Sequence, residues 1–358
     1  MNVHYPDIHT INNFIEKFSN KKKQRNTMNK TIILDKRPVG KPQLTDFKFI
    51  DDEKPQAGIN EIVLKARYVS VDPYLRGRMS DAKSYSAPFE LQKPISSGVV
   101  AEVVESNLTG FIKGDYVSGL LEWKEYQKSD GKGLLKIDPD KAVLSAYLGV
   151  LGMTGLTAYL GLTEIGKPKP GETLVVSGAA GAVGSIVGQI GKLSGCRVVG
   201  IAGTDEKAAM LKAKYGFDAA INYNTTDNMK EAIAAACPDG VDVYFDNVGG
   251  EITDGVLANI NQFARLIICG SISVYNETSV PVGPRVETTL VKNSALMQGF
   301  IVRNYAAKFP EAMAKLTKWL QEGKLTYTET IVEGFDQIPQ AFIGLFEGKN
   351  NGKMIVKI

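Results

Sequence analysis

The sequence contains almost no histidine. Its 358 residues include only His4 and His9, and both lie close to the N-terminus. Histidine and cysteine are the usual protein ligands of a catalytic zinc, and histidine is the base in serine and cysteine hydrolases. We therefore expect no bound metal in the body of the chain and no catalytic triad that depends on histidine.

Cysteine, strong charge and long apolar runs are also scarce. The three cysteines, Cys196, Cys237 and Cys269, have no paired spacing, which predicts reduced, mostly buried thiols in a cytoplasmic protein. We expect neither a membrane span nor a secretory signal, because no apolar run has the required length and position. The net charge of +3 is too small to indicate a nucleic acid or membrane partner, so a small-molecule substrate is expected.

The most informative segment is rich in glycine. A strand-like run over 173–177 leads into Gly178-Ala179-Ala180-Gly181-Ala182-Val183-Gly184, and a second strand-like run covers 197–202. Between them, apolar residues recur at helical spacing: Val183, Ile186, Val187, Ile190 and Leu193. This order of strand, glycine turn, helix and strand is typical of the unit that holds a dinucleotide pyrophosphate at a helix N-terminus.

Two of these glycines have distinct expected roles. Gly181 allows the backbone to approach the phosphates, and Gly184 allows the helix to pack closely on the strand. Ala179 replaces the first glycine of the usual G-x-G-x-x-G motif. The alternative interpretation of the segment is an ordinary tight turn in a parallel sheet.

The acidic residue typical of NAD sites is absent. Such sites carry Asp or Glu after the second strand, where the carboxylate binds the ribose 2′-hydroxyl, but residues 201–204 contain none. Asp205 is expected in the cap or first turn of a helix over 205–215. Lys207 is the candidate partner of a 2′-phosphate, with a solvated helix lysine as the alternative. The pattern favours NADPH/NADP+ as the cofactor.

The chain is long enough for two domains. Residues 28–150 have short alternating runs typical of β-structure, and residues 329–358 are expected to return to the same domain. Residues 151–328 alternate strand and helix patterns, which predicts a doubly wound parallel sheet and an α/β fold. Residues 1–27 are expected to form a disordered extension, with a targeting tail as the alternative and Met28 as an alternative start.

The pattern also predicts elements with definite bounds. Beyond the segments already named, strands are expected over 219–223, 241–246, 264–269 and 296–302. Helices are expected over 228–236, 252–259 and 310–321. The final segment should add a helix around 337–346 and a strand over 353–358.

Several segments together resemble one enzyme family. They are Val71–Met79, Gly152–Tyr159, Ala179–Gly184, Phe245–Gly250, Ile268–Ser273 with Tyr275-Asn276, and Gly352-Lys353. Over about residues 28–358 the sequence is similar to the zinc-independent medium-chain dehydrogenase/reductases, in the branch of prostaglandin reductase, leukotriene B4 12-hydroxydehydrogenase and curcumin reductase. The resemblance implies a GroES-like β-rich catalytic domain, a Rossmann domain that binds NADP, and a homodimer.

The resemblance also implies cofactor-binding roles at matching positions. The residues expected to line the pyrophosphate are Gly181, Ala182, Val183 and Gly184. Lys207 and Tyr223 should hold the 2′-phosphate, and Asn350 should lie near the phosphoribose end of the nicotinamide. The residues expected along the cofactor toward the nicotinamide are Asn247, Cys269, Gly270, Ser271, Tyr275, Phe300, Ile301 and Val302.

Several of these positions have a simpler interpretation. Asn247 is also typical of a turn before two glycines. Cys269 is also consistent with core packing, and Phe300–Val302 with a buried strand. The neighbouring Asn351 leaves the register of Asn350 open by one residue.

The implied reaction is the reduction of a carbon–carbon double bond conjugated to a carbonyl group. Hydride from NADPH adds to the β-carbon, and negative charge develops on the carbonyl oxygen, where a hydrogen-bond donor is needed. Tyr275 and Tyr74 are the catalytic candidates, because a phenol stays protonated at neutral pH. In the alternative interpretation, Tyr74 packs beside Arg76 and Arg78, and Tyr275 only supports the cofactor.

Two other functions remain open from the sequence. One is a zinc-free NADPH quinone oxidoreductase, with the same fold and cofactor but a different electron acceptor. The other is a non-catalytic NADPH-binding sensor. A double-bond reductase is favoured over both because the segments Val71–Met79 and Tyr275-Asn276 resemble the enone-reducing branch.

Overall fold

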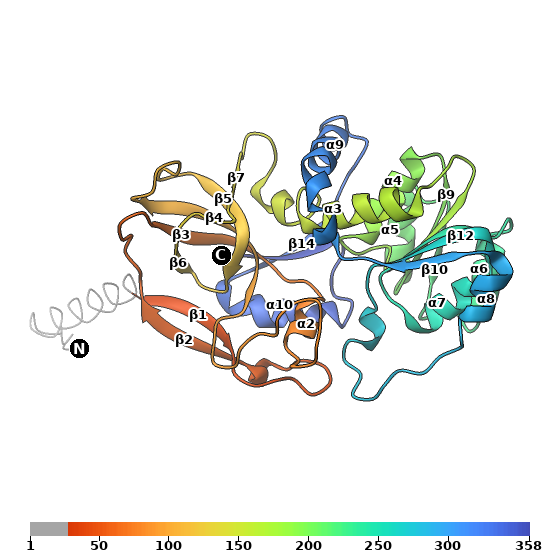
Figure 1. Cartoon of the computed structure of the whole chain (residues 1–358), viewed down its shortest axis with the longest axis horizontal. Coiled ribbons are helices and arrows are strands. Elements are labelled where there is room, and N and C mark those ends of the chain that lie inside the picture. The colour runs from red at the N-terminus through yellow and green to blue at the C-terminus, as the bar shows by residue number, and fades with distance from the viewer. Residues whose placement is uncertain (1–27) are drawn as a thin grey trace, which may run out of the picture.

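The structure is a computed structural model that describes residues 28–358. The predicted extension over 1–27, with both histidines, lies outside the described residues. Figure 1 shows two lobes along the long axis of the molecule, each built around one sheet. No helix of the described part is long and apolar enough to cross a membrane.

The first lobe contains a mostly antiparallel sheet with strand order β14-β15-β3-β4-β5-β7, and β6 pairs with β3. The strands are β3 (Ile62–Ser70), β4 (Ser96–Ser106), β5 (Tyr116–Glu122), β6 (Tyr126–Ser129), β7 (Leu135–Ile137), β14 (Glu329–Glu333) and β15 (Lys353–Lys357). A hairpin of β1 (Met28–Leu34) and β2 (Phe47–Glu53) lies beside it. The C-terminal strands therefore complete a sheet that begins near the other end of the chain.

Alternating apolar residues of these strands form the main core of this lobe on one face of the sheet. A smaller cluster includes Val100, Ile137 and Ile355. Trp123 is fully buried in the main core, and its indole N–H donates to Ser97 Oγ at 2.8 Å. Helix α10 (Ile338–Leu345) adds Ile338 and Phe342 to the same core. Because α10 precedes β15 in the chain, the C-terminal segment belongs to this lobe by packing as well as by strand pairing (Figure 1).

The second lobe contains a six-stranded parallel sheet with the order β10-β9-β8-β11-β12-β13. The strands are β8 (Thr173–Ser177), β9 (Arg197–Ala202), β10 (Ala219–Asn222), β11 (Val241–Asp246), β12 (Ile260–Ile268) and β13 (Leu296–Gly299). Strand order reverses between β8 and β11. A crevice at such a switch point, outside the carboxyl ends of the strands, is where doubly wound sheets bind ligands.

Helices cover both faces of this sheet. One face packs against α3 (Met153–Leu160) with its π-helical continuation (Gly161–Gly166), α4 (Gly184–Leu193), α5 (Asp205–Tyr215) and α9 (Phe309–Gln321). The other face packs against α6 (Met229–Ala236), α7 (Gly250–Leu257) and α8 (Glu287–Asn293). The strands are apolar on both sides, as a covered parallel sheet requires. The predicted α/β fold with a doubly wound parallel sheet is confirmed.

Most predicted bounds agree with the observed elements, but two strands differ. The expected strand over 264–269 begins earlier, at Ile260, and ends at Ile268. The expected strand over 296–302 ends at Gly299. Gly299 pairs with Ile268, the last residue of β12, so no neighbouring strand remains to accept further ladder bonds. Val302 instead begins a short 3-10 segment, Val302–Lys308. Leu193 also departs from the expected apolar stripe, since its side chain is exposed at the helix end.

Candidate active site

The glycine turn after β8 leads directly into α4. A Cβ atom at Gly184 would lie 2.5 Å from the Gly178 carbonyl oxygen, so the helix approaches the strand too closely for any other residue. Gly181, Ala182 and Val183 are only partly buried at the helix N-terminus. The N-terminal N–H groups of a helix attract phosphate, so this loop fits the pyrophosphate of a dinucleotide.

The end of β9 forms the neighbouring part of the site. Thr204 caps α5 by accepting the Lys207 N–H at 3.2 Å, which places Asp205 in the first turn as expected. The Lys207 ammonium donates to the Gly348 carbonyl at 2.6 Å, and burial lowers the pKa of Lys207. A Cβ at Gly203 would lie 2.6 Å from the Tyr223 hydroxyl. Lys207 and Tyr223 therefore both lie near the end of β9, where Gly203 leaves room for the Tyr223 hydroxyl.

Asn247 follows β11 on the other side of the switch point. Its amide Nδ2 donates to the Ser177 carbonyl at 2.8 Å, and its backbone N–H donates to Ser177 Oγ at 2.8 Å. The adjacent Asp246 is buried and accepts from Ser177 Oγ and from the hydroxyls of Tyr244 and Thr253. These bonds join the ends of β8 and β11, so Asn247 has a fixed position in the crevice.

A cavity of about 340 Å³ lies at the carboxyl ends of β12 and β13. The residues that line it are Ile268, Cys269, Gly270, Ser271, Gly299, Phe300, Ile301 and Asn304. It therefore unites two predicted segments that are far apart in the sequence. Val302 points elsewhere, since it packs against Leu156 and Leu160 of α3.

The side chains of this cavity are uncharged. Burial raises the pKa of the Cys269 thiol to about 12, so the thiol stays protonated. The ring of Phe300 packs edge-on against Phe245 and Tyr305, with ring centres 6.3 Å apart in each pair. An apolar wall with a protonated thiol suits a flat, neutral ring better than a charged group.

Tyr275 follows a short 3-10 turn, Ile272–Val274, beside this cavity. Its hydroxyl oxygen accepts the Ser271 N–H at 3.3 Å. Burial raises the pKa of Tyr275. Because the oxygen accepts one bond and keeps its proton, the O–H of Tyr275 is available to donate a hydrogen bond to a ligand.

Tyr74 comes from the other lobe. It immediately precedes α2 (Leu75–Arg78), and burial raises its pKa, as does the nearby Asp72. Its hydroxyl has no hydrogen-bond partner among residues 28–358, and the raised pKa keeps this phenol protonated at neutral pH. Arg303 contributes to the electrostatic field at Tyr74, which places the two lobes next to each other here.

Two residues of the cleft were not found by sequence reasoning. Arg303 Nη2 donates to Ser86 Oγ at 2.9 Å, although 217 residues separate them in the chain. Tyr85, next to Ser86, affects the pKa of Tyr275. Tyr85 lies in a loop and Arg303 in the 3-10 segment Val302–Lys308. Neither has a motif around it, so only the three-dimensional fold brings these segments together.

The loop after α10 closes the site from the side of the first lobe. The Gly352 N–H donates to the Ala180 carbonyl in the glycine turn at 2.8 Å, and Asn350 Nδ2 donates to the Gly352 carbonyl at 2.8 Å. Asn350 thus lies between Gly348, which binds Lys207, and Gly352, which binds the glycine turn. The role expected for Asn350, near the phosphoribose end of the nicotinamide, stays a prediction.

Comparisons with known proteins identify the family. Residues 30–137 match the model described as the N-terminal domain of oxidoreductase, and residues 182–319 match the model described as zinc-binding dehydrogenase. A putative NADP-dependent oxidoreductase of Bacillus subtilis, YfmJ, is 56% identical over 91% of this chain and 97% of its own. The NADPH-dependent curcumin reductase of Escherichia coli is 42% identical over 94% of this chain and 98% of its own.

The chain belongs to the medium-chain dehydrogenase/reductases, in their zinc-independent branch. A solved structure agrees with this assignment. The CurA protein of Vibrio vulnificus in complex with NADPH has 45% sequence identity and a TM-score of 0.88, covering 92% of this chain and 98% of that one. The predicted family and the expected pairing of a GroES-like and a Rossmann domain are confirmed.

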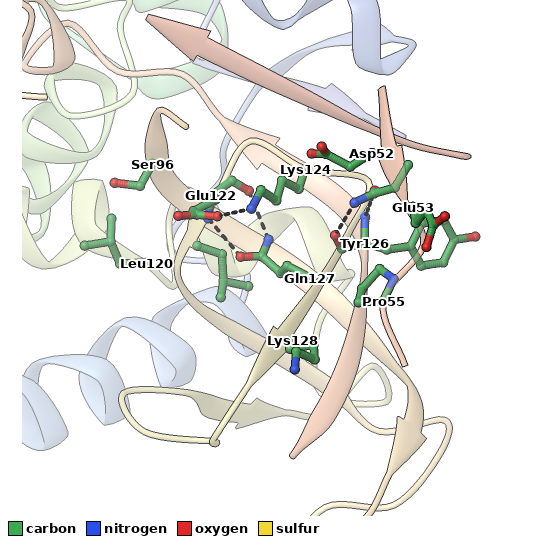
Figure 2. A pocket seen from close by; sticks show the side chains of 12 residues that line it. Asp52, Glu53, Pro55, Ser96, Leu120, Glu122, Lys124, Tyr126, Gln127 and Lys128 are labelled. Atoms are coloured by element: carbon green, nitrogen blue, oxygen red, sulfur yellow. Dashed lines mark hydrogen bonds and ion pairs between the residues drawn. The ribbon is translucent and has the colours of Figure 1, made fainter. Parts of the chain in front are cut away.

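This medium-chain dehydrogenase/reductase carries a second hollow, of about 700 Å³, on the first lobe (Figure 2). Its polar side chains bind one another: Lys124 pairs with Glu122 at 2.6 Å, and Gln127 donates to the Glu122 carbonyl at 3.0 Å. Asn29 similarly donates to the Tyr126 carbonyl. None of the predicted site residues lines this hollow, so the cleft between the lobes is the candidate active site.

The described part of this family member contains no cluster of three or more histidine, cysteine or acidic residues that could hold a metal ion. The residues around the switch point instead offer backbone N–H groups, one lysine, phenols and an apolar wall. That set fits a phosphorylated dinucleotide with a flat ring.

Proposed function

We propose that this enzyme reduces the carbon–carbon double bond of α,β-unsaturated ketones and aldehydes with NADPH. The observation that supports the proposal is a pair of phenols with raised pKa values, Tyr275 and Tyr74, which share Tyr85 as an electrostatic neighbour. A curcumin reductase and an NADPH-bound CurA among the relatives support the same chemistry.

The cofactor would extend along the crevice at the carboxyl ends of the parallel strands. The residues proposed to hold it are Gly181, Ala182, Val183, Gly184, Lys207, Tyr223, Asn247, Cys269, Gly270, Ser271, Tyr275, Phe300, Ile301, Val302 and Asn350. Of these, Val302 does not line the cavity and would support the cofactor only indirectly, by packing against α3. The ammonium of Lys207 would bind the 2′-phosphate, and the α4 N-terminus would bind the pyrophosphate.

Bound NADPH supplies the hydride that adds to the β-carbon of the substrate. The phenol of Tyr275 would donate a hydrogen bond to the carbonyl oxygen, where negative charge develops. Tyr74 would donate from the opposite lobe. Their raised pKa values keep both protons in place at neutral pH. Neither phenol needs to give up its proton if water supplies the proton for the α-carbon.

A substrate panel tests the proposal. Purified enzyme is mixed with NADPH or NADH and with an alkenal, an enone or a quinone, and products are identified along with cofactor consumption. We expect saturated carbonyl products, with NADPH as the preferred cofactor. A reduced quinone as the only product would favour a quinone oxidoreductase, and cofactor binding without turnover would favour a sensor.

We further propose that the protein is a cytoplasmic homodimer. Strand β13 forms one edge of the six-stranded sheet, and Val280, Val282 and Val291 near it in the chain are strongly exposed. An open edge beside exposed apolar side chains is suited to pairing with a second copy. The three unpaired cysteines suit a reducing compartment. Sedimentation analysis of the wild type and of Val282→Asp tests the dimer.

A further inference from the structure

A buried ion pair lies between the first lobe and the glycine turn. The Lys353 ammonium is 3.1 Å from Asp72 Oδ1, and the two side chains are only 4% and 8% exposed. Lys353 Nζ also donates to the carbonyls of Val71 at 2.9 Å and Met354 at 2.8 Å. The ammonium therefore has an acceptor for each of its protons.

Stability alone is a weak reason for such a pair. Removing two charges from water costs so much that apolar residues of similar size are often at least as stabilising. Buried ion pairs can instead fix the relative position of the segments that carry them. Lys353 begins β15, and Asp72 lies between β3 and α2, so this pair joins two segments that are far apart in the sequence.

The position of Lys353 is set by contacts between the preceding residue and the glycine turn. The preceding Gly352 donates its N–H to Ala180 at 2.8 Å and forms a parallel bridge with Gly181. A Cβ at Gly352 would lie 1.9 Å from the Thr328 carbonyl oxygen, and its φ of +65° also favours glycine. The start of β15 is therefore held directly against the loop proposed to bind the pyrophosphate.

Asp72 is hydrogen-bonded to the turn that contains Tyr74. Its carboxylate accepts the Ser70 hydroxyl, and its carbonyl accepts the Leu75 N–H at 3.1 Å in the turn that begins α2. Tyr74 lies within that turn. One continuous set of contacts thus runs from Ala180 through Gly352, Lys353 and Asp72 to the segment that carries Tyr74.

We propose that Lys353 and Asp72 are positioning residues that set the distance between the Tyr74 hydroxyl and the cofactor. The inference rests on the proposed function, in which Tyr74 donates to the substrate carbonyl. A displacement of about 1 Å in a reacting geometry can lower a rate by ~100-fold. The ion pair prevents such a displacement by joining the Tyr74 turn to the strand that contacts the glycine turn.

The test compares the pair with and without Tyr74. The variants are Lys353→Met/Asp72→Asn, Tyr74→Phe and the triple combination, and hydride transfer is followed in single turnovers at saturating NADPH and enone. We expect the pair substitution to slow hydride transfer ~10-fold or more when Tyr74 is present, and by less than ~2-fold when Phe replaces it. A pair that acts through Tyr74 has no further effect once the phenol is gone.

Two outcomes overturn the inference, and they differ. If Tyr74→Phe slows transfer but the pair substitution is equally harmful in both backgrounds, the pair is only structural and the proposed function stands. If Tyr74→Phe keeps the wild-type rate, the donor role of Tyr74 fails and the positioning role fails with it.

Two further variants control the experiment. Lys357→Met, on the same strand, removes an exposed ion pair with Glu333 and should leave hydride transfer unchanged. Asp72→Asn alone keeps an oxygen acceptor for Lys353. This single variant keeps the test possible if the double variant does not fold. Its smaller rate loss should again depend on Tyr74, and an equal loss in the Tyr74→Phe background would overturn the proposal.

Discussion

The Lys207 ammonium lies 2.6 Å from the Gly348 carbonyl oxygen, although 141 residues separate them in the chain. The cationic residue of the second lobe is therefore held by a loop of the first lobe. Burial lowers the pKa of Lys207, which means that its charge is poorly solvated there. An anionic phosphate would stabilise that charge better than a neutral carbonyl does.

Replacement of Lys207 by alanine should weaken NADPH binding much more than NADH binding. A charge-assisted hydrogen bond contributes roughly 1.5–3 kcal/mol, which corresponds to a change of ~10- to 100-fold in the dissociation constant. Fluorescence titrations of both cofactors measure the ratio. Lys212→Ala, an exposed position on the same helix, is the matched control, and an unchanged NADPH/NADH ratio in Lys207→Ala would contradict the assignment.

Tyr275→Phe should lower kcat for an enone by a larger factor than it lowers NADPH affinity. Loss of one preorganised donor to a developing oxyanion costs on the order of 100-fold in rate. Stopped-flow hydride transfer at saturating NADPH measures the loss. Tyr116→Phe, on β5 in the other sheet, serves as the control. A rate within a factor of about two of wild type would show that Tyr275 does not donate to the carbonyl.

The free energy of unfolding should fall as the pH rises above about 9. Burial raises the pKa of Cys237 from its ordinary 9.0 to about 11. Above pH 9 the thiol therefore ionises in the unfolded chain while the native chain keeps its proton, so the unfolded state gains stability. Urea unfolding between pH 8 and 10.5 measures the slope.

A serine variant isolates the contribution of this thiol to the pH dependence. Cys237→Ser carries no group that ionises in this range, so its slope should be shallower than that of the wild type. Other buried groups titrate in both proteins and cancel in the comparison. Identical slopes would mean that the thiol of Cys237 ionises equally well in the native state.

Gly352→Ala should destabilise the protein far more than Gly323→Ala. Both glycines have a positive φ, +65° and +68°, but only Gly352 has a backbone oxygen at 1.9 Å from the added Cβ. Each variant has the backbone strain of about 1 kcal/mol, and Gly352→Ala adds a collision with Thr328. Thermal unfolding compares the two, and equal losses would indicate that β15 shifts freely away from Thr328.

The sequence predicted those parts of the fold in which local chemistry is strong. The bounds of β8, β9, β11 and α5 were predicted to the residue, since glycine and helix caps flank each run. The strand over 296–302 was too long because its end depends on where β12 stops. The end of β13 is set by its pairing with a neighbouring strand, so the local sequence pattern does not indicate it.

Helix α3 was missed for a different reason. Gly152 and Gly155 suggest a loop, yet a Cβ at Gly155 would lie 1.9 Å from the Val150 carbonyl oxygen. The glycine is there to allow close packing at the helix start. Tyr275 and Tyr74 were identified through family resemblance, whereas Tyr85 and Arg303 meet the cleft only through contacts across the two lobes.

The contact between Gly352 and Ala180 also bears on the order of events during protein synthesis. The glycine turn leaves the ribosome well before β15, and until β15 has been made both that turn and the edge of β3 lack their partners. The parallel sheet can fold early, but in a nascent chain at that stage the proposed cofactor site lacks the loop that contains Gly348 and Gly352. Cofactor capture should therefore be a late event in biogenesis, after β15 has paired with β3 and Gly352 has reached the glycine turn.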